Sequence, residues 1–186
     1  MLKNLSIDIN PKERVALVGH NGAGKTTIIK LLLRLYDPTE GEILLNGVNI
    51  KEYNLNEYRN LFGTVFQDYR IFSVSVYDNV AMCNNEINRE EVIEALQKSG
   101  IYDKIKEFPK GIDTILTREF DDEGAILSGG EIQKIAIARM FARKNSFAIL
   151  DEPTSALDPI AEYQMYENMM EATKNKTVIF ISHRLS

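Results

Sequence analysis

Cysteine, long apolar runs and clusters of one charge are all scarce in this sequence of 186 residues. Cys83 is the only cysteine, so no disulfide can form within the chain, which fits a reducing compartment. No Cys/His cluster surrounds it, and we interpret Cys83 as a small buried apolar residue.

The chain also lacks the segments that direct a protein into or across a membrane. Its first residues contain no apolar region of the secretory type, and no stretch reaches the ~18 to 20 unbroken apolar residues of a membrane span. Repeats, low-complexity tracts and Pro/Gly/Ser-rich linkers are absent as well. We therefore expect the chain alone to be soluble and to form one domain, or one core with an inserted subdomain.

Acidic residues outnumber basic ones: the sequence has 27 Asp and Glu and 22 Lys and Arg, which gives a net charge of −5. No run of Lys or Arg stands out, so the composition argues against nucleic-acid binding as the main function. Any affinity for phosphate must therefore come from a local arrangement of the chain.

Such an arrangement is present at residues 19–27, which fit the pattern G-x-x-x-x-G-K-[ST]. Glycine permits backbone conformations that a Cβ would forbid, so several N–H groups can point toward one phosphate chain. The lysine adds a positive charge, and the threonine offers a hydroxyl to Mg²⁺. The alternative is a structural turn with an incidental lysine. The segment consists of Gly19, His20, Asn21, Gly22, Ala23, Gly24, Lys25, Thr26 and Thr27.

The flanking residues predict the strand and the helix that such a loop requires. Residues 14–18 are a short apolar run typical of a buried parallel strand, and residues 28–35 predict a helix that is apolar nearly all round. Residues 2–9 alternate between apolar and polar, which predicts a half-buried strand. Asn46-Gly47 predicts a type I′ hairpin.

The middle of the chain has a different character. Residues 62–66 predict a strand that delivers Gln67 to its end, and Asn88 is placed to cap a helix. We interpret residues 75–130 as a helical subdomain inserted into an α/β core formed by residues 1–74 and 131–186.

A second candidate anion site begins at Ser128-Gly129-Gly130-Glu131. Ser128 and Glu131 have capping-box spacing, and the two glycines leave N–H groups bare at the start of an apolar helix. A well-capped structural helix start is the alternative.

Polar residues then follow two predicted buried strands. Asp151 and Glu152 follow residues 146–150, and His183 follows residues 177–181. Carboxylates at the end of an apolar strand are costly unless they are used, although structural ion pairs are an alternative. A lone histidine there is more often structural. Pro159 predicts the first residue of the helix between the strands.

Together these motifs resemble the nucleotide-binding domain of ABC transporters. They are Walker A at residues 19–26, the Q-loop glutamine Gln67, the signature at residues 127–131, Walker B at residues 147–151 with Glu152 after it, the D-loop at residues 155–158 and the switch histidine His183. The resemblance implies a P-loop NTPase core with a mixed sheet. It is most similar to exporter-type domains over residues 65–80.

The resemblance also implies ATP as substrate and Mg²⁺ as cofactor. Glu152 would act on the attacking water, with His183 and Gln67 beside it in catalysis. The metal would be held by Thr26, Gln67 and Asp151. The second copy in a head-to-tail homodimer would contribute Ser128, Gly129 and Gly130. Asp158 of the D-loop is the further residue implied to bind the nucleotide.

A transmembrane domain or subunit is the further partner implied, which would place the chain at the cytoplasmic face of the membrane. The family has an aromatic residue upstream of Walker A and continues beyond the switch histidine, so we expect a domain truncated at both ends. Residues 117–124 keep part of the exporter pattern T-E-x-G-x-x-G, and Glu131 replaces the usual glutamine.

Two alternatives remain at this point. One is a module that binds ATP without hydrolysing it. The other is a non-transport ABC-type ATPase, which is disfavoured because no sustained heptads separate Gln67 from Leu127.

Overall fold

The computed structural model describes residues 2–20, 22–66, 68–82, 84, 86–151 and 159–182. The chain divides into two compact units, the first made of Met1–Thr64, Asn145–Glu152 and Asn175–Ser186, the second of Val65–Lys144 and Pro153–Lys174. These two units are defined by how compactly their residues pack, not by function. The functional division at residues 74 and 131 stays a prediction.

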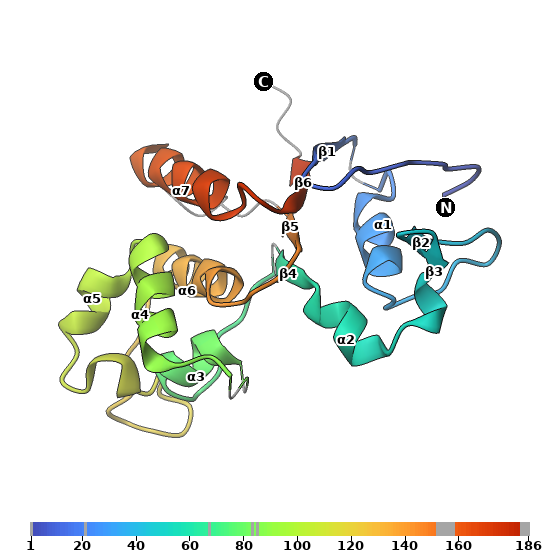
Figure 1. Cartoon of the computed structure of the whole chain (residues 1–186). Coiled ribbons are helices and arrows are strands. Elements are labelled where there is room, and N and C mark those ends of the chain that lie inside the picture. Colours follow the sequence, from blue (N-terminus) through green and yellow to red (C-terminus); the bar gives the residue numbers. More distant parts are fainter. Residues whose placement is uncertain are drawn as a thin grey trace. The chain divides into compact units, whose positions relative to one another are not determined.

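The first unit contains a four-stranded sheet with strand order β1-β6-β5-β4 (Figure 1). The strands are β1 (Arg14–Val18), β4 (Phe62–Val65), β5 (Phe147–Asp151) and β6 (Thr177–Ser182). β6 pairs in parallel with both β1 and β5. The parallel strands predicted from short apolar runs are therefore confirmed.

Burial differs between these strands. Ala148, Ile149 and Leu150 in β5 are fully buried, whereas β1 alternates between exposed and half-buried positions. The expectation that residues 14–18 are buried was wrong, because β1 is the outer strand of the described sheet and has β6 on one side only.

Residues 2–9 form no strand, so that prediction was wrong as well. Leu5 and Ile7 are each about half exposed. An alternating segment becomes a strand only when another strand completes its hydrogen bonds, and none of the described strands pairs with it.

The hairpin is confirmed as β2 (Leu44–Leu45) and β3 (Val48–Asn49). Asn46 and Gly47 have φ values of 52° and 80°, the two left-handed residues that a type I′ turn requires. The 3₁₀ helix η1 (Ile50–Glu52) and α2 (Leu55–Asn60) follow, and Asn54 caps α2 through its side chain.

Helix α1 (Lys25–Leu32) begins three residues earlier than predicted. It ends before Arg34, whose φ of 50° is incompatible with a continuing helix. Ile29 is fully buried, whereas Leu35 is half exposed. The predicted helix is therefore present with earlier bounds, and Ile29 belongs to its buried face.

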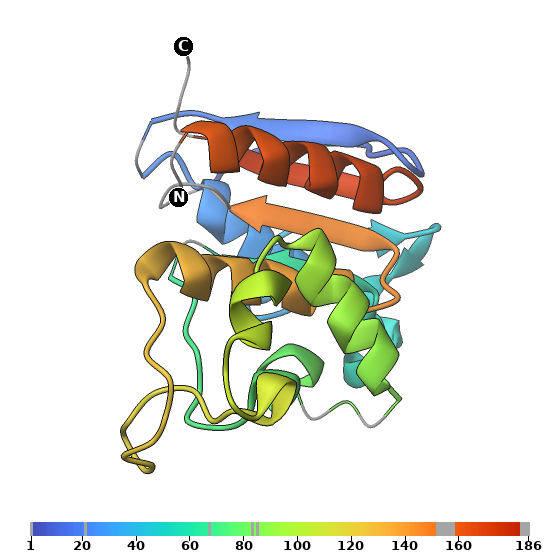
Figure 2. The same ribbon diagram turned by 90° about the vertical axis from the view of Figure 1, so that its left-hand side faces the viewer.

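The second unit is helical (Figure 2). Its core joins α3, α4 and α6 through side chains such as Val80, Leu96 and Ile135, all of them fully buried. Asn88 caps the start of α4, as the sequence predicts, and it forms a capping box with Glu91. The elements are α3 (Val76–Ala81), α4 (Arg89–Lys98), α5 (Tyr102–Lys106), η2 (Gly111–Asp113), α6 (Gly129–Phe141) and α7 (Pro159–Ala172).

No helix within the described part of the chain combines the length and apolarity needed to cross a membrane.

Candidate functional site

The glycine loop joins the end of β1 to the start of α1 in the first unit. Gly22 and Gly24 have φ values of 81° and 94°, a region that other residues enter at a cost. A Cβ on Gly24 would come within 2.7 Å of the Leu2 side chain, whereas one on Gly22 would meet nothing within 4 Å. The loop thus uses glycine for backbone conformation at both positions.

The N-terminus of α1 is left open toward this loop. Gly24 occupies the N-cap position, so no side chain caps the helix, and the first turn holds no acidic residue. The first N–H groups of a helix have no intrahelical partner and carry its positive partial charge. This end of α1 therefore fits an anion.

Lys25 folds back over the loop. Its Nζ donates hydrogen bonds to the carbonyl oxygens of Gly19 at 2.6 Å and His20 at 3.0 Å, and the residue is only 7% exposed. An ammonium has three donors, and these carbonyls account for two. The cation is thereby held against the backbone that would cradle a phosphate.

The remaining loop side chains face solvent. Thr26, Thr27, His20 and Ala23 are exposed, and the Ala23 N–H donates to the His20 carbonyl at 3.1 Å. The predicted loop residue Asn21 lies outside the described residues.

The second predicted anion site is the start of α6 in the second unit. Ser128 is the N-cap, and the capping box with Glu131 is present as the sequence predicts. Ser128 and Gly129 are exposed, and a Cβ on Gly129 would meet nothing within 4 Å. Gly130 is half-buried. This helix start is therefore open for an approaching ligand.

Glu131 is a charged member of that site. A hydrogen bond from the Ser128 backbone holds the pKa of Glu131 below its ordinary value, against partial burial that raises it. The Ser128 hydroxyl, Lys104 and Lys134 lower it further. The carboxylate is therefore ionised at neutral pH.

Parallel strands bring Asp151 to the same edge of the sheet as the glycine loop. Val18 pairs with Ser182 and Asp151 with Ile181, so β1, β6 and β5 end together. Asp151 is 8% exposed. In parallel sheets, ligands bind outside these carboxyl ends. The predicted residues Gln67, Glu152, Asp158 and His183 lie outside the described residues.

Within the described ranges, no group of three or more His, Cys, Asp and Glu is placed to hold a metal ion. A magnesium ion bound with a nucleotide takes most of its ligands from phosphate and water, so one or two protein oxygens suffice. Thr26 and Asp151 offer oxygens of that kind.

Sequence reasoning missed Arg139. Its guanidinium donates to the Asn79 carbonyl at 2.7 Å, the Arg70 carbonyl at 2.6 Å and the Asn79 side-chain oxygen at 3.0 Å. Burial lowers the pKa of Arg139 to about 10. The signal available was an arginine inside the apolar helix α6.

Asn79 extends this network to residues 72–75. Its buried amide accepts from the Phe72 N–H and donates to the carbonyls of Phe72, Val74 and Ser75. Asn79 and Arg139 together fix the path of the chain after the predicted Q-loop.

An exposed apolar surface lies on the same unit, and we call it the 72/120 surface. Residues 72–75 and 115–126 are joined by a bridge between Ser75 and Ile115 and by a hydrogen bond from the Ser73 hydroxyl to Glu119 at 3.1 Å. Four large side chains protrude from these two segments, namely Phe72, Val74, Phe120 and Ile126, at 51%, 38%, 83% and 70% exposure.

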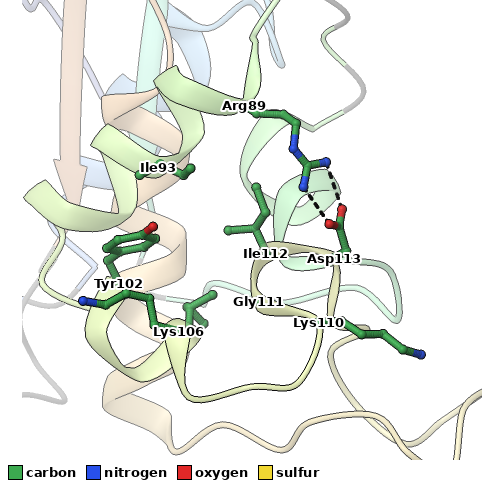
Figure 3. Close-up of a pocket in the computed structure, with 9 residues that line it drawn as sticks. Arg89, Ile93, Tyr102, Lys106, Lys110, Gly111, Ile112 and Asp113 are labelled. Atoms are coloured by element: carbon green, nitrogen blue, oxygen red, sulfur yellow. Dashed lines mark hydrogen bonds and ion pairs between the residues drawn. The ribbon is translucent and has the colours of Figure 1, made fainter.

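A pocket of about 260 Å³ lies between α4, α5 and η2 (Figure 3). Arg89 forks onto Asp113 with contacts of 3.0 and 2.6 Å, and Lys106 pairs with Asp103 at 2.7 Å. Its described lining includes none of the residues predicted to bind nucleotide. Charges at its rim are largely neutralised by neighbours.

The loop between β1 and α1, with its buried lysine and open helix end, is that of a P-loop nucleotide-binding domain. Residues 2–155 match the family model described as ABC transporter. The chain belongs to the ABC transporter family, and it is an ATP-binding domain of that family. ATP-binding domains of this family are ATPases.

Relatives match this chain from end to end. The ATP-dependent lipid A-core flippase of Haemophilus influenzae is 41% identical over 100% of this chain and 31% of its own length. The subtilin transport ATP-binding protein SpaT of Bacillus subtilis is 41% identical over 99% of this chain and 30% of its own. The chain therefore spans about a third of the length of these relatives.

A solved structure of a bacterial Atm1-family ABC exporter with ATP bound is 38% identical, with a TM-score of 0.87 over 97% of this chain and 31% of that one. The predicted fold class, an α/β P-loop NTPase with a parallel sheet and an antiparallel pair, is confirmed.

Proposed function

We propose that this chain is the ATP-hydrolysing domain that powers substrate export through a membrane partner, by ATP-driven head-to-tail homodimerisation. The observation that carries the proposal is the pair of glycine-containing helix starts, uncapped before Lys25 and capped by the exposed Ser128. Each offers bare N–H groups to an anion, and each belongs to a different compact unit.

In this proposal, the glycine loop at residues 19–27 binds the phosphates of ATP. Lys25 and the N–H groups of residues 22–27 hold the β- and γ-phosphates of ATP. Phosphoryl transfer depends mainly on positioning and charge neutralisation, and both come from this preorganised loop. Glu152 orients the attacking water, and His183 supports it.

Thr26, Gln67 and Asp151 would hold Mg²⁺, which neutralises charge on the phosphate oxygens when bound. The fit rests on oxygen chemistry, because hydroxyl, amide and carboxylate oxygens are the ligands that Mg²⁺ prefers.

The second copy supplies the signature helix. Ser128, Gly129 and Gly130 would approach the γ-phosphate that the first copy holds, with Asp158 at the interface. A site divided between copies makes hydrolysis depend on dimerisation. The exposure of Ser128 and Gly129 supports this arrangement.

The 72/120 surface is where we propose that a transmembrane domain docks. Large apolar side chains exposed on two joined segments favour an interaction site, and residues 117–124 carry part of the exporter pattern. Asn79 and Arg139 tie this surface to α6, so movement of the signature helix would reach the partner. The domain would then work at the cytoplasmic face of the membrane.

The test adds Mg-ATP to the wild-type chain and to Glu152→Gln, and follows dimer formation and phosphate release. We expect turnover in the wild type and a trapped dimer in the variant. Binding without turnover or dimer would instead support the alternative of a binding module. Phosphate release from a chain that stays monomeric would contradict the divided site.

A further inference from the structure

The signature of this chain ends in a glutamate that engages the motif's own serine. The Ser128 N–H donates to Glu131 Oε2 at 2.7 Å, and the Ser128 hydroxyl donates to the same oxygen at 2.8 Å. The reverse bond, from the Glu131 N–H to Ser128 Oγ, is long at 3.4 Å. The single proton of this hydroxyl is therefore committed to a carboxylate within the same turn.

That commitment competes with phosphate. A hydroxyl has one donor, so Ser128 must leave Glu131 before it can donate to a phosphate oxygen. A hydrogen bond to a carboxylate is roughly twice as strong as one between neutral groups. The negative charge of Glu131 also offsets the positive end of α6, which would otherwise attract the anion.

The charges of Lys104 and Lys134 favour the ionised carboxylate of Glu131, but they offset its negative charge only in part, because each ammonium bonds to another group. Lys104 of α5 pairs with Glu107 at 2.8 Å, and Lys134 of α6 donates to the Gly100 carbonyl at 3.3 Å.

We propose that Glu131 is a brake on ATP-driven dimerisation: it holds the Ser128 proton and repels the γ-phosphate, so closure needs more ATP than it would with a neutral residue. This inference rests on the proposed function and assigns a regulatory role at the same site. Glu131 acts through Ser128 and through its charge, so it is a positioning residue.

The chain contains its own matched control. At the start of α4 the Asn88 N–H donates to Glu91 Oε2 at 3.0 Å, and the Glu91 N–H donates to Asn88 Oδ1 at 2.9 Å. Glu91→Gln and Glu131→Gln therefore make the same chemical change in two capping boxes of the same unit. Each changes the net charge from −5 by one, to −4.

The experiment uses the full chain in the Glu152→Gln background. Dimer fraction is measured by size-exclusion chromatography with light scattering, across a range of Mg-ATP concentrations at one protein concentration. We expect Glu131→Gln to lower the ATP concentration at half-dimerisation at least fivefold, and Glu91→Gln to change it less than twofold. Glu131→Gln removes the charge but keeps an amide oxygen that can accept from the hydroxyl, whereas Glu131→Ala removes both the charge and the acceptor. The alanine variant therefore carries the test if the glutamine variant does not fold.

Two failures are distinguishable. In the first, the Glu152→Gln chain dimerises with ATP, and adding Glu131→Gln or Glu91→Gln leaves the ATP concentration at half-dimerisation unchanged. This result contradicts the brake and leaves the proposed function standing. A parent that stays monomeric at every ATP concentration contradicts the proposed dimer and the brake together.

Discussion

Lys25 is a charged side chain that the loop keeps almost out of solvent. Burying an ammonium is costly unless oxygen atoms replace its water, and the carbonyls of Gly19 and His20 do so. The consequence is functional, because the side chain is already in position near the open end of α1. Little ordering is then required when a phosphate binds.

Replacing this lysine should remove most of the affinity for ATP. We expect Lys25→Ala to weaken ATP binding about a hundredfold, or ~2.7 kcal/mol, because a charge-assisted contact to phosphate is lost. Fluorescent-nucleotide titration measures it. Lys30→Ala is the control, since Lys30 lies in the same helix over the Tyr36 ring. Equal losses in both variants would contradict the role given to Lys25.

Helix α6 shows how one residue joins two segments of the second unit. Arg139 uses Nε and both terminal nitrogens, all on oxygens of Arg70 and Asn79. A lysine has one nitrogen and cannot reproduce this fork. The path of residues 70–75 thus depends on Arg139 together with Asn79.

Arg139→Lys should therefore lower the free energy of unfolding by about 2 kcal/mol, because hydrogen bonds of a largely buried guanidinium are lost. Arg89→Lys is the matched control. Its fork onto Asp113 lies at the surface, with both side chains more than half exposed, so its loss should lower the free energy of unfolding much less than the loss of the Arg139 fork does. Urea unfolding compares the two, and equal losses would show that burial of the fork does not matter.

Tyr58 of α2, which bonds to α1, predicts that the free energy of unfolding depends on pH. Its hydroxyl donates to the Leu32 carbonyl at 2.6 Å, and burial raises the pKa of Tyr58 to about 12. The folded chain then retains a proton that the unfolded chain loses near pH 10, so this stability is complete below pH 10 and is lost as pH rises toward 12.

We expect the free energy of unfolding to fall by about 1 kcal/mol more between pH 10 and 11 in the wild type than in Tyr58→Phe. Urea titrations at the two pH values measure this difference. Tyr36→Phe, at an exposed tyrosine, should behave as the wild type does. If the free energy of unfolding falls by the same amount between pH 10 and 11 in the wild type and in Tyr58→Phe, Tyr58 is not the cause of the pH dependence.

Elements defined by local chemistry were predictable from sequence. Asn46-Gly47, the Asn88 cap and the Ser128–Glu131 box each depend on residues close in the chain, and each is present. Residues 2–9 were mispredicted because a strand depends on a neighbour that local sequence does not specify. Arg139 was missed for the same reason, since its partners lie 60 or more residues away.

At the scale of the whole molecule, the two candidate anion sites belong to different compact units. The glycine loop belongs to the first unit and the signature helix to the second. The sequence predicted both from short motifs, whereas their meeting in one active site depends on a second copy. That meeting is the central claim of the proposed function.

Complementation between two inactive variants tests this claim most directly. Lys25→Ala removes the loop cation, and Gly129→Asp puts a carboxylate at the exposed start of α6, where a Cβ has room. Consider a head-to-tail dimer of one Lys25→Ala subunit and one Gly129→Asp subunit. The glycine loop of the Gly129→Asp subunit is intact, and it faces the intact signature helix of the Lys25→Ala subunit. One site of that dimer is therefore complete.

Each variant alone should release no phosphate from Mg-ATP above background. An equal mixture should recover about a quarter of the wild-type rate, because half of the dimers are mixed and each has one complete site out of two. A mixture as inactive as its components, with both variants folded and dimers formed, would contradict a site shared between two copies.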